Sequence, residues 1–187
     1  MRFVIFKAAL NILLSASFVM LSQGVIVAQG VIVSDRQPEA LFEIAEGEVW
    51  HYFKGSDAPP SKWKQVHFDD SRWLSGPSGF GYGDGMYNTP LDDMRNNYAS
   101  VFVRREFLLN NTAEVTGMTL FIECGGAFKA YLNGIEVIRS DIPFAEELDI
   151  SGFIHELHSR ANVIAIECQN NDISSRRFNF IPFFWID

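Results

Sequence analysis

Residues suited to sugar recognition gather in two polar stretches of this 187-residue sequence. A sugar presents apolar ring faces and a rim of hydroxyl groups, so its binding site needs an aromatic ring beside amide or carboxylate groups. The long glycine-rich loop that starts at residue 76 and the polar turn at residues 169–172 contain both kinds of side chain. With a tryptophan that precedes the loop, the candidate ligand-binding residues are Trp73, Tyr82, Asp84, Tyr87, Arg95, Gln169 and Asn170.

The same residues have a simpler structural interpretation. Glycines at residues 79–85 suit a tight crossing between strands, with Tyr82 packed inward. Trp63 and Trp73 flank an Asp-Asp-Ser turn, where tryptophans more often pin a loop onto the core than stack on a sugar. The turn at residues 169–172 is also typical of a solvated connection. The sequence leaves both interpretations open.

Motifs for catalysis are missing from the sequence. It contains no Gly-x-Ser-x-Gly nucleophile elbow, no His-Glu-x-x-His zinc motif and no phosphate-binding glycine loop with lysine. A carboxylate pair for glycoside cleavage is defined by a separation in space that a sequence does not give. We therefore expect a protein that is not an enzyme and has no cofactor. Aspartates such as Asp84 and Asp92 offer oxygen ligands for a structural Ca²⁺, but their spacing matches no calcium loop.

The composition narrows the range of partners. The chain has 15 Lys and Arg against 23 Asp and Glu, a formal charge of −8. This balance argues against a nucleic-acid surface, which needs clustered basic residues, and against docking on anionic lipid. A hydrophobic content of 48% with 20% charged residues is ordinary for one globular domain. The expected partners are a glycan or another extracellular protein.

The N-terminal residues 1–28 have the pattern of a secretory signal peptide. Arg2 and Lys7 precede a short apolar run, and Ile26-Val27-Ala28 offers a cleavage site. The run is about 14 residues long, which is short for a membrane span, so an uncleaved anchor is the less favoured alternative. We expect a linker at 29–40, a mature domain at 41–187, and a secreted, periplasmic or extracellular protein with no membrane insertion after cleavage.

Export affects how the two cysteines are interpreted. Cys124 and Cys168 each end a segment in which every second residue is apolar, so both sulfurs should face apolar neighbours. In an oxidising compartment, neighbouring strands would allow a disulfide that closes a loop of about 44 residues and adds about 2–4 kcal/mol. Two buried, unreacted thiols are the alternative. A metal site is disfavoured because neither cysteine has a close Cys or His partner.

Alternating apolar residues predict short strands, turn signals and almost no helix. This pattern indicates an all-β fold, an antiparallel β-sandwich with no internal repeat. The expected strands are 41–45, 49–53, 99–109, 115–124, 127–132, 135–139, 148–150, 162–168 and 178–185.

Four local signals add detail to this pattern. Asn133-Gly134 predicts a type I′ hairpin turn, and residues 151–159 predict one helical turn. Pro182 predicts that the last strand lies at a sheet edge, because proline cannot donate a ladder hydrogen bond. Arg105 shares the apolar face of its strand, which predicts either a buried, paired arginine or a bulge.

Six sequence segments occur in order along the chain: Trp50-His-Tyr-Phe-Lys-Gly55 with Trp63, Phe68-Asp-Asp-Ser-Arg-Trp73, Gly79-Phe-Gly-Tyr-Gly-Asp-Gly85, Val101-Phe-Val-Arg-Arg-Glu-Phe107, Ala130-Tyr-Leu-Asn-Gly134 and Asn162-Val-Ile-Ala-Ile-Glu167. Together they resemble the galactose-binding-like jelly-roll domain of secreted bacterial multi-module proteins. The resemblance covers about residues 41–187. It implies an antiparallel jelly-roll β-sandwich that serves as a carbohydrate-binding or structural accessory.

Two departures from the family pattern concern its ligand-binding turns. The sequence has Cys124-Gly-Gly-Ala127 where the family often has an Asp-Asp-Gly turn, which removes candidate oxygen ligands for Ca²⁺ and for sugar hydroxyls. Gln169 precedes Asn170 where the family often has histidine. The function we expect is that of a secreted, non-catalytic module with weak glycan recognition through loop aromatics and amides. The alternative is a structural or protein-interaction sandwich without a small ligand.

Overall fold

The computed structural model describes residues 40–187, and two packed β-sheets dominate this part of the chain. The expected signal peptide at 1–28, and the expected linker up to residue 39, lie outside the described residues. Within residues 40–187 no helix is long and apolar enough to cross a membrane.

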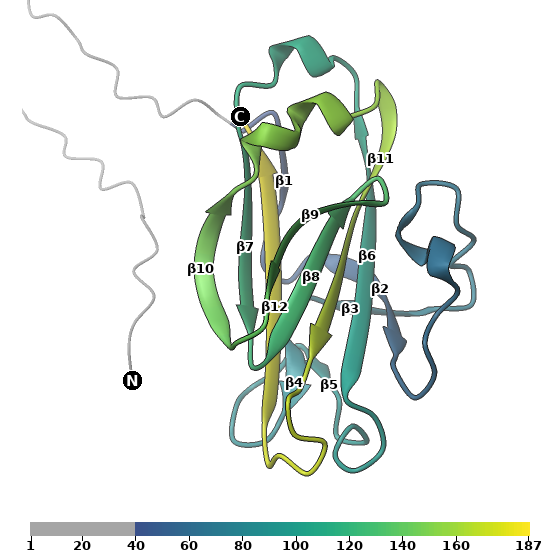
Figure 1. The fold of residues 1–187 in the computed structure, drawn as a ribbon, viewed down its shortest axis with the longest axis vertical. Helices are drawn as coiled ribbons and strands as arrows, with labels where there is room; N and C mark the ends of the chain where they lie inside the picture. The colour runs from purple at the N-terminus through teal and green to yellow at the C-terminus, as the bar shows by residue number, and fades with distance from the viewer. Residues whose placement is uncertain (1–39) are drawn as a thin grey trace, which may run out of the picture. The chain divides into compact units, whose positions relative to one another are not determined.

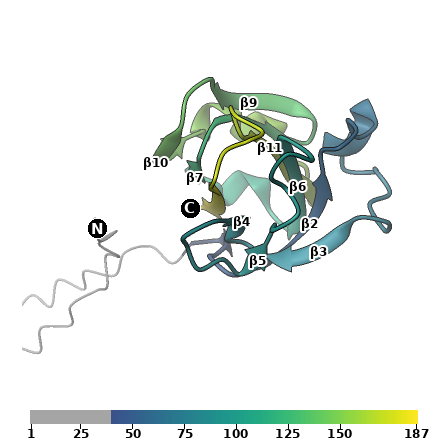
Figure 2. The same cartoon turned by 90° about the horizontal axis from the view of Figure 1, so that it is seen from below.

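Each sheet has six strands, and the two lie face to face (Figures 1 and 2). The first sheet has the order β10-β7-β12-β4-β5, with β1 also paired to β12. Its strands are β1 (Phe42–Ile44), β4 (Phe80–Tyr82), β5 (Thr89–Pro90), β7 (Met118–Cys124), β10 (Phe144–Asp149) and β12 (Phe178–Ile186).

The second sheet has the order β3-β2-β6-β11-β8-β9. Its strands are β2 (Val49–Lys54), β3 (Leu74–Pro77), β6 (Ser100–Leu109), β8 (Ala127–Leu132), β9 (Ile135–Ser140) and β11 (Arg160–Gln169). Short 3₁₀ turns are η1 (Ser61–Lys64), η2 (Thr112–Glu114) and η3 (Ser151–Glu156). The expected all-β sandwich is confirmed; among the pairs of described strands, β4 with β5 is parallel and the others are antiparallel.

Alternation along the strands places the core where the sequence predicts it. On β7, Leu120 and Ile122 are fully buried between the sheets, whereas Phe121 and Glu123 face outward and are partly exposed. Ile164 and Ile166 on β11 are also fully buried. Each such aliphatic side chain stabilises the fold by roughly 1.5–3 kcal/mol relative to leaving it exposed. Asn133 and Gly134 both have positive φ, 52° and 95°, as the expected hairpin turn requires.

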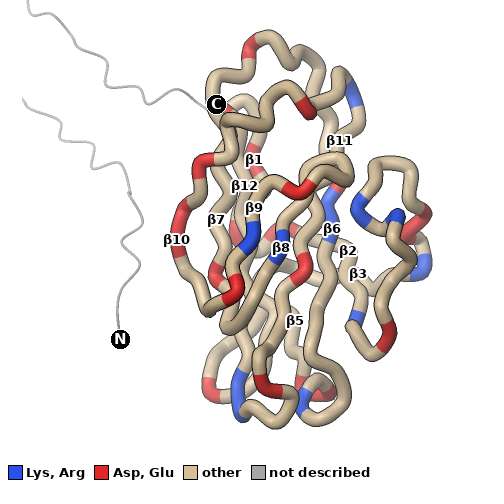
Figure 3. The backbone as a smooth tube through the Cα atoms, in the orientation of Figure 1, with Lys and Arg blue, Asp and Glu red and all other residues tan. Residues whose placement is uncertain are grey.

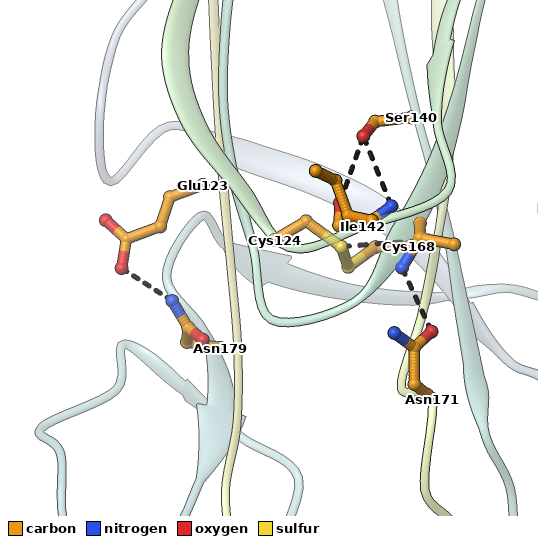
Figure 4. The surroundings of a disulfide bond; sticks show 8 residues. Glu123, Cys124, Ser140, Ile142, Cys168, Asn171 and Asn179 are labelled. Atoms are coloured by element: carbon orange, nitrogen blue, oxygen red, sulfur yellow. Dashed lines mark hydrogen bonds between the residues drawn. A yellow bond between two sulfur atoms is a disulfide. The ribbon is translucent and has the colours of Figure 1, made fainter.

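The two cysteines form a disulfide that joins the two sheets (Figure 4). Cys124 ends β7 in the first sheet, and Cys168 lies on β11 in the second, with Cα atoms 6.2 Å apart. The strands are therefore not neighbours within one sheet; they face each other across the core. Of the two alternatives that the sequence left open, the structure contains the disulfide.

The last strand is not at an edge, contrary to the expectation from Pro182. β12 pairs with β7 along Phe180–Ile186, and on its other side with β4 at one end and β1 at the other. Pro182 lies between the β4 and β1 pairings, where only β7 is a partner. This gap tolerates a residue without an N–H group, as a sheet edge does.

An aromatic cluster separate from the core covers part of the outer face of the second sheet. Trp63 of η1 meets Trp73 with ring centroids 6.0 Å apart, and packs edge-on against Phe102 and Tyr131. Figure 1 shows this segment in blue beside β2 and β6. Tryptophans flanking the Asp-Asp-Ser turn thus hold a loop on the sheet.

The fully buried arginine is Arg104, not Arg105. Arg104 lies beneath this loop, paired with Asp70 and donating to the Gln65 carbonyl oxygen at 3.1 Å. The neighbouring Arg105 is about one-third exposed at its side chain, donates to the Val49 carbonyl oxygen and pairs with Glu48 at 3.1 Å. Arg105 is therefore paired, as one of the two alternatives expected, but it is only partly buried. The burial of Arg104 was missed because the sequence pattern does not show that a loop covers the outer face.

We expect reduction of the disulfide to lower the free energy of unfolding by about 2–4 kcal/mol, because the open chain gains conformational entropy when it unfolds. Urea unfolding of the oxidised and reduced domain measures the difference. In a Cys124→Ala/Cys168→Ala variant the reductant should have no effect. An unchanged midpoint for the reduced wild type would contradict this prediction.

Asp70→Asn should destabilise the domain by about 3 kcal/mol, because it leaves the buried Arg104 guanidinium without its main carboxylate partner. The matched control is Asp57→Asn, which removes an exposed carboxylate in a loop. Thermal unfolding of both variants provides the test. Equal midpoints for the two variants would show that Asp70 contributes no more than a surface charge.

Candidate functional site

An open pocket of about 860 Å³ lies where β7 ends and β12 begins. Its walls come from Glu123–Gly125, from residues 143–145 at the start of β10, from Asn179 and Ile181, and from the loop at 84–88. These segments are distant in sequence but adjacent in the first sheet, since Glu123 pairs in register with both Ala145 and Ile181. The volume is in the range of small-molecule sites.

The ring of Tyr87 packs closely against Gly81 and Gly85 beside this pocket. A Cβ atom added at Gly81 would overlap the Tyr87 ring and the Phe178 carbonyl oxygen, and one at Gly85 would lie 2.7 Å from the phenol oxygen. Only glycine therefore lets the ring pack this closely. Tyr87 is partly exposed and lines the pocket, so the loop provides an aromatic surface for a ligand.

A carboxylate and an amide meet on the outer face of the first sheet (Figure 4). Asn179 Nδ2 donates to Glu123 Oε1 at 2.5 Å, and the Gly125 N–H donates to the Asn179 carbonyl oxygen at 3.0 Å. Neither Glu123 nor Asn179 was among the candidates expected from the sequence. The alternation of buried and exposed residues could have indicated them, because each occupies an outward position next to a buried residue on its strand.

Tyr82 packs inward and positions the turn that follows β11. Its ring is 5% exposed and stacks on Phe178 with centroids 6.5 Å apart. Its hydroxyl donates to the Ser175 carbonyl oxygen at 2.9 Å and accepts from Asn170 Nδ2 at 3.2 Å. Burial raises the pKa of this phenol above its usual value. Tyr82 therefore supports Asn170, which lines the pocket, and offers no free ring face.

The structure brings together three of the seven candidates from the sequence: Asp84, Tyr87 and Asn170 line the same pocket. The long loop and the turn at 169–172 thus border one concavity. Gln169 borders a separate cavity of about 100 Å³ next to β8. Arg95 donates to the Ser174 carbonyl oxygen at 3.1 Å, outside the pocket lining.

The seventh candidate, Trp73, belongs to the aromatic cluster on the second sheet. Its ring contacts Trp63, Phe53 and Phe68 with centroids 5.4–6.0 Å apart. In the described part of the chain no three His, Cys, Asp or Glu side chains converge to hold a metal ion.

Comparison with solved structures finds the same fold within much larger enzymes. A Bacteroides uniformis beta-glucuronidase matches with a TM-score of 0.58 at 17% identity, over 78% of this chain and 18% of that chain. A beta-glucuronidase from an uncultured Clostridium matches with a TM-score of 0.54 at 14% identity, over 80% and 30% of the two chains. No protein-family model and no curated protein sequence matches the chain.

A third enzyme matches in the same way. The beta-glucuronidase from Ruminococcus gnavus, solved in complex with D-glucuronic acid, has a TM-score of 0.53 at 13% identity, over 80% of this chain and 30% of that chain. These similarities show a shared β-sandwich fold. The chain spans less than a third of the length of each of these enzymes.

Gly85→Ala should displace the Tyr87 ring, because the new methyl group would overlap the phenol. Burial is the largest contribution to the raised pKa of Tyr87, so a displaced, hydrated ring should titrate closer to 10. NMR of the ring resonances across an alkaline titration measures both effects. Gly152→Ala is the control, because a Cβ there meets nothing within 4 Å. Unchanged Tyr87 resonances in Gly85→Ala would contradict the packing described here.

Proposed function

We propose that the domain is an exported, non-catalytic module of the galactose-binding-like jelly-roll type that binds glycan weakly in the pocket beside Tyr87. The observation that carries the proposal is the partly exposed Tyr87 ring, held on glycines next to Glu123 and Asn179. An aromatic face provides the contact for the apolar side of a sugar, while carboxylate and amide groups accept and donate hydrogen bonds at its hydroxyl rim.

Four observations support an exported protein with a binding role. The disulfide between the sheets is typical of exported proteins, and the N-terminal sequence has the pattern of a secretory signal. The sequence also lacks the common catalytic motifs. The fold is shared with a minor part of each matched glycosidase, which is consistent with an accessory module.

The outer face of the first sheet favours a second candidate function, a protein-interaction domain. Phe121 and Phe183 stack there with centroids 5.0 Å apart, and both are partly exposed, as is Trp185 further along β12. Each of the two phenylalanine rings therefore has one face covered by the other ring. Such a surface suits packing against another domain.

Binding to a glycan array tests the proposal directly. Tyr87→Ala should lower affinity by roughly threefold to tenfold, the range of one lost aromatic contact, while Tyr87→Phe keeps the ring and most of the affinity. Phe183→Ala removes an aromatic ring from the same sheet face outside the pocket and should leave glycan binding unchanged.

The array separates the two candidate functions. A folded domain that binds no glycan supports the protein-interaction function instead. Glycan binding that Tyr87→Ala leaves intact would place the site elsewhere on the sandwich and overturn the assignment to this pocket.

A further inference from the structure

The pocket beside Tyr87 carries an excess of negative charge. Glu46, Asp84 and Glu123 line it, whereas Arg177 is the single lysine or arginine among its lining residues. Figure 3 also shows acidic residues along β10, the strand whose first residues form one wall. Three carboxylates against one guanidinium make this a site that repels anions.

These carboxylates are largely free to meet a ligand. Within residues 40–187, Glu46 and Asp84 make no side-chain hydrogen bond or ion pair with a described residue, and both residues are exposed. Glu123 accepts one hydrogen bond, from Asn179 to Oε1, which leaves Oε2 available. None of the three carboxylates therefore forms an ion pair within residues 40–187.

Charged groups from several elements act on the same aromatic ring. Burial raises the pKa of Tyr87, and the negative charge of Asp84 raises it further; Arg177 opposes this effect, and Glu123 adds to it. The loop at 84–88, the end of β7 and the segment before β12 thus converge on one ring. The surroundings of the Tyr87 ring therefore disfavour a negatively charged group and favour a positively charged one.

This arrangement suits a protonated amine. An ammonium group forms strong, charge-assisted hydrogen bonds with carboxylates and is attracted to the face of a tyrosine ring. A sugar with a free amino group combines that cation with the apolar face and hydroxyl rim that the pocket already matches. A uronic acid would instead place its carboxylate among Asp84, Glu123 and Glu46.

We propose that the pocket is selective for glycans whose sugars carry a free, protonated amino group, and that it discriminates against uronic acids. The inference rests on the proposed function, because it names the class of glycan bound at that same site.

Titration calorimetry with three short oligosaccharides tests the selectivity. The probes are a glucosamine dimer, the N-acetylglucosamine dimer and a glucuronic-acid-containing disaccharide, at pH 6 and about 0.15 M salt, where the Debye length is about 8 Å. The glucosamine dimer should bind at least about tenfold more tightly than its acetylated form, and the acidic disaccharide should not bind. Glu123→Gln and Asp84→Asn should each weaken glucosamine binding by about threefold.

Glu43→Gln is the matched control for general surface charge. Glu43 is an exposed carboxylate on β1, in the same sheet but next to the far end of β12, and it does not line the pocket. This substitution should leave glucosamine binding unchanged. If it weakens binding as much as Glu123→Gln does, the attraction is non-specific and the inference is overturned.

The probes distinguish failure of this inference from failure of the proposed function. If the acetylated or acidic sugar binds as well as glucosamine and Tyr87→Ala weakens that binding, glycan binding stands and amine selectivity is wrong. If no sugar in the set or on the glycan array binds the folded domain, the proposed function fails and this inference fails with it.

Discussion

The structure depends on the burial of alternate side chains between two sheets. Each strand has one inward row that fills the core and one outward row that is free for other roles. β7 shows both in adjacent residues: Cys124 points into the sandwich and is bonded to Cys168, while Glu123 points outward and borders the pocket. The disulfide therefore holds the end of β7 at the position that presents Glu123.

The alternation of inward and outward positions also determines which aromatic residue of the glycine-rich loop is buried. Tyr82 and Tyr87 are both aromatic residues of this loop, yet one is buried and the other lines the pocket. Tyr82 ends β4, where its ring joins the core and its hydroxyl holds Asn170. Tyr87 returns over the outer side of β4, where Gly81 leaves room for a ring. The glycines thus serve both packing and the candidate site.

Local patterns in the sequence predict most of the strands, the hairpin at Asn133-Gly134 and the inward orientation of both cysteines. They do so because alternation and turn chemistry are properties of neighbouring residues. They do not predict that Pro182 lies in a gap between two partner strands, or that Glu123 meets Asn179. Those features depend on pairing between segments more than 50 residues apart, such as the 56 that separate Glu123 from Asn179. Arg104 was missed for the same reason, because the loop that buries it is contributed by residues 34 or more positions earlier.

The two outer faces of the sandwich differ in what covers them, and the proposed function uses the face of the first sheet. The loop around η1 covers part of the outer face of the second sheet, where its tryptophans pack beside the paired Arg104. The first sheet has no such covering segment within residues 40–187 over Phe121, Phe183 and Glu123, which remain partly exposed. This face therefore contains an apolar area, the stacked phenylalanine pair, and a polar area, the pocket beside Tyr87. Phe121 and Phe183 do not line the pocket, so the two proposed functions would use different atoms of this face.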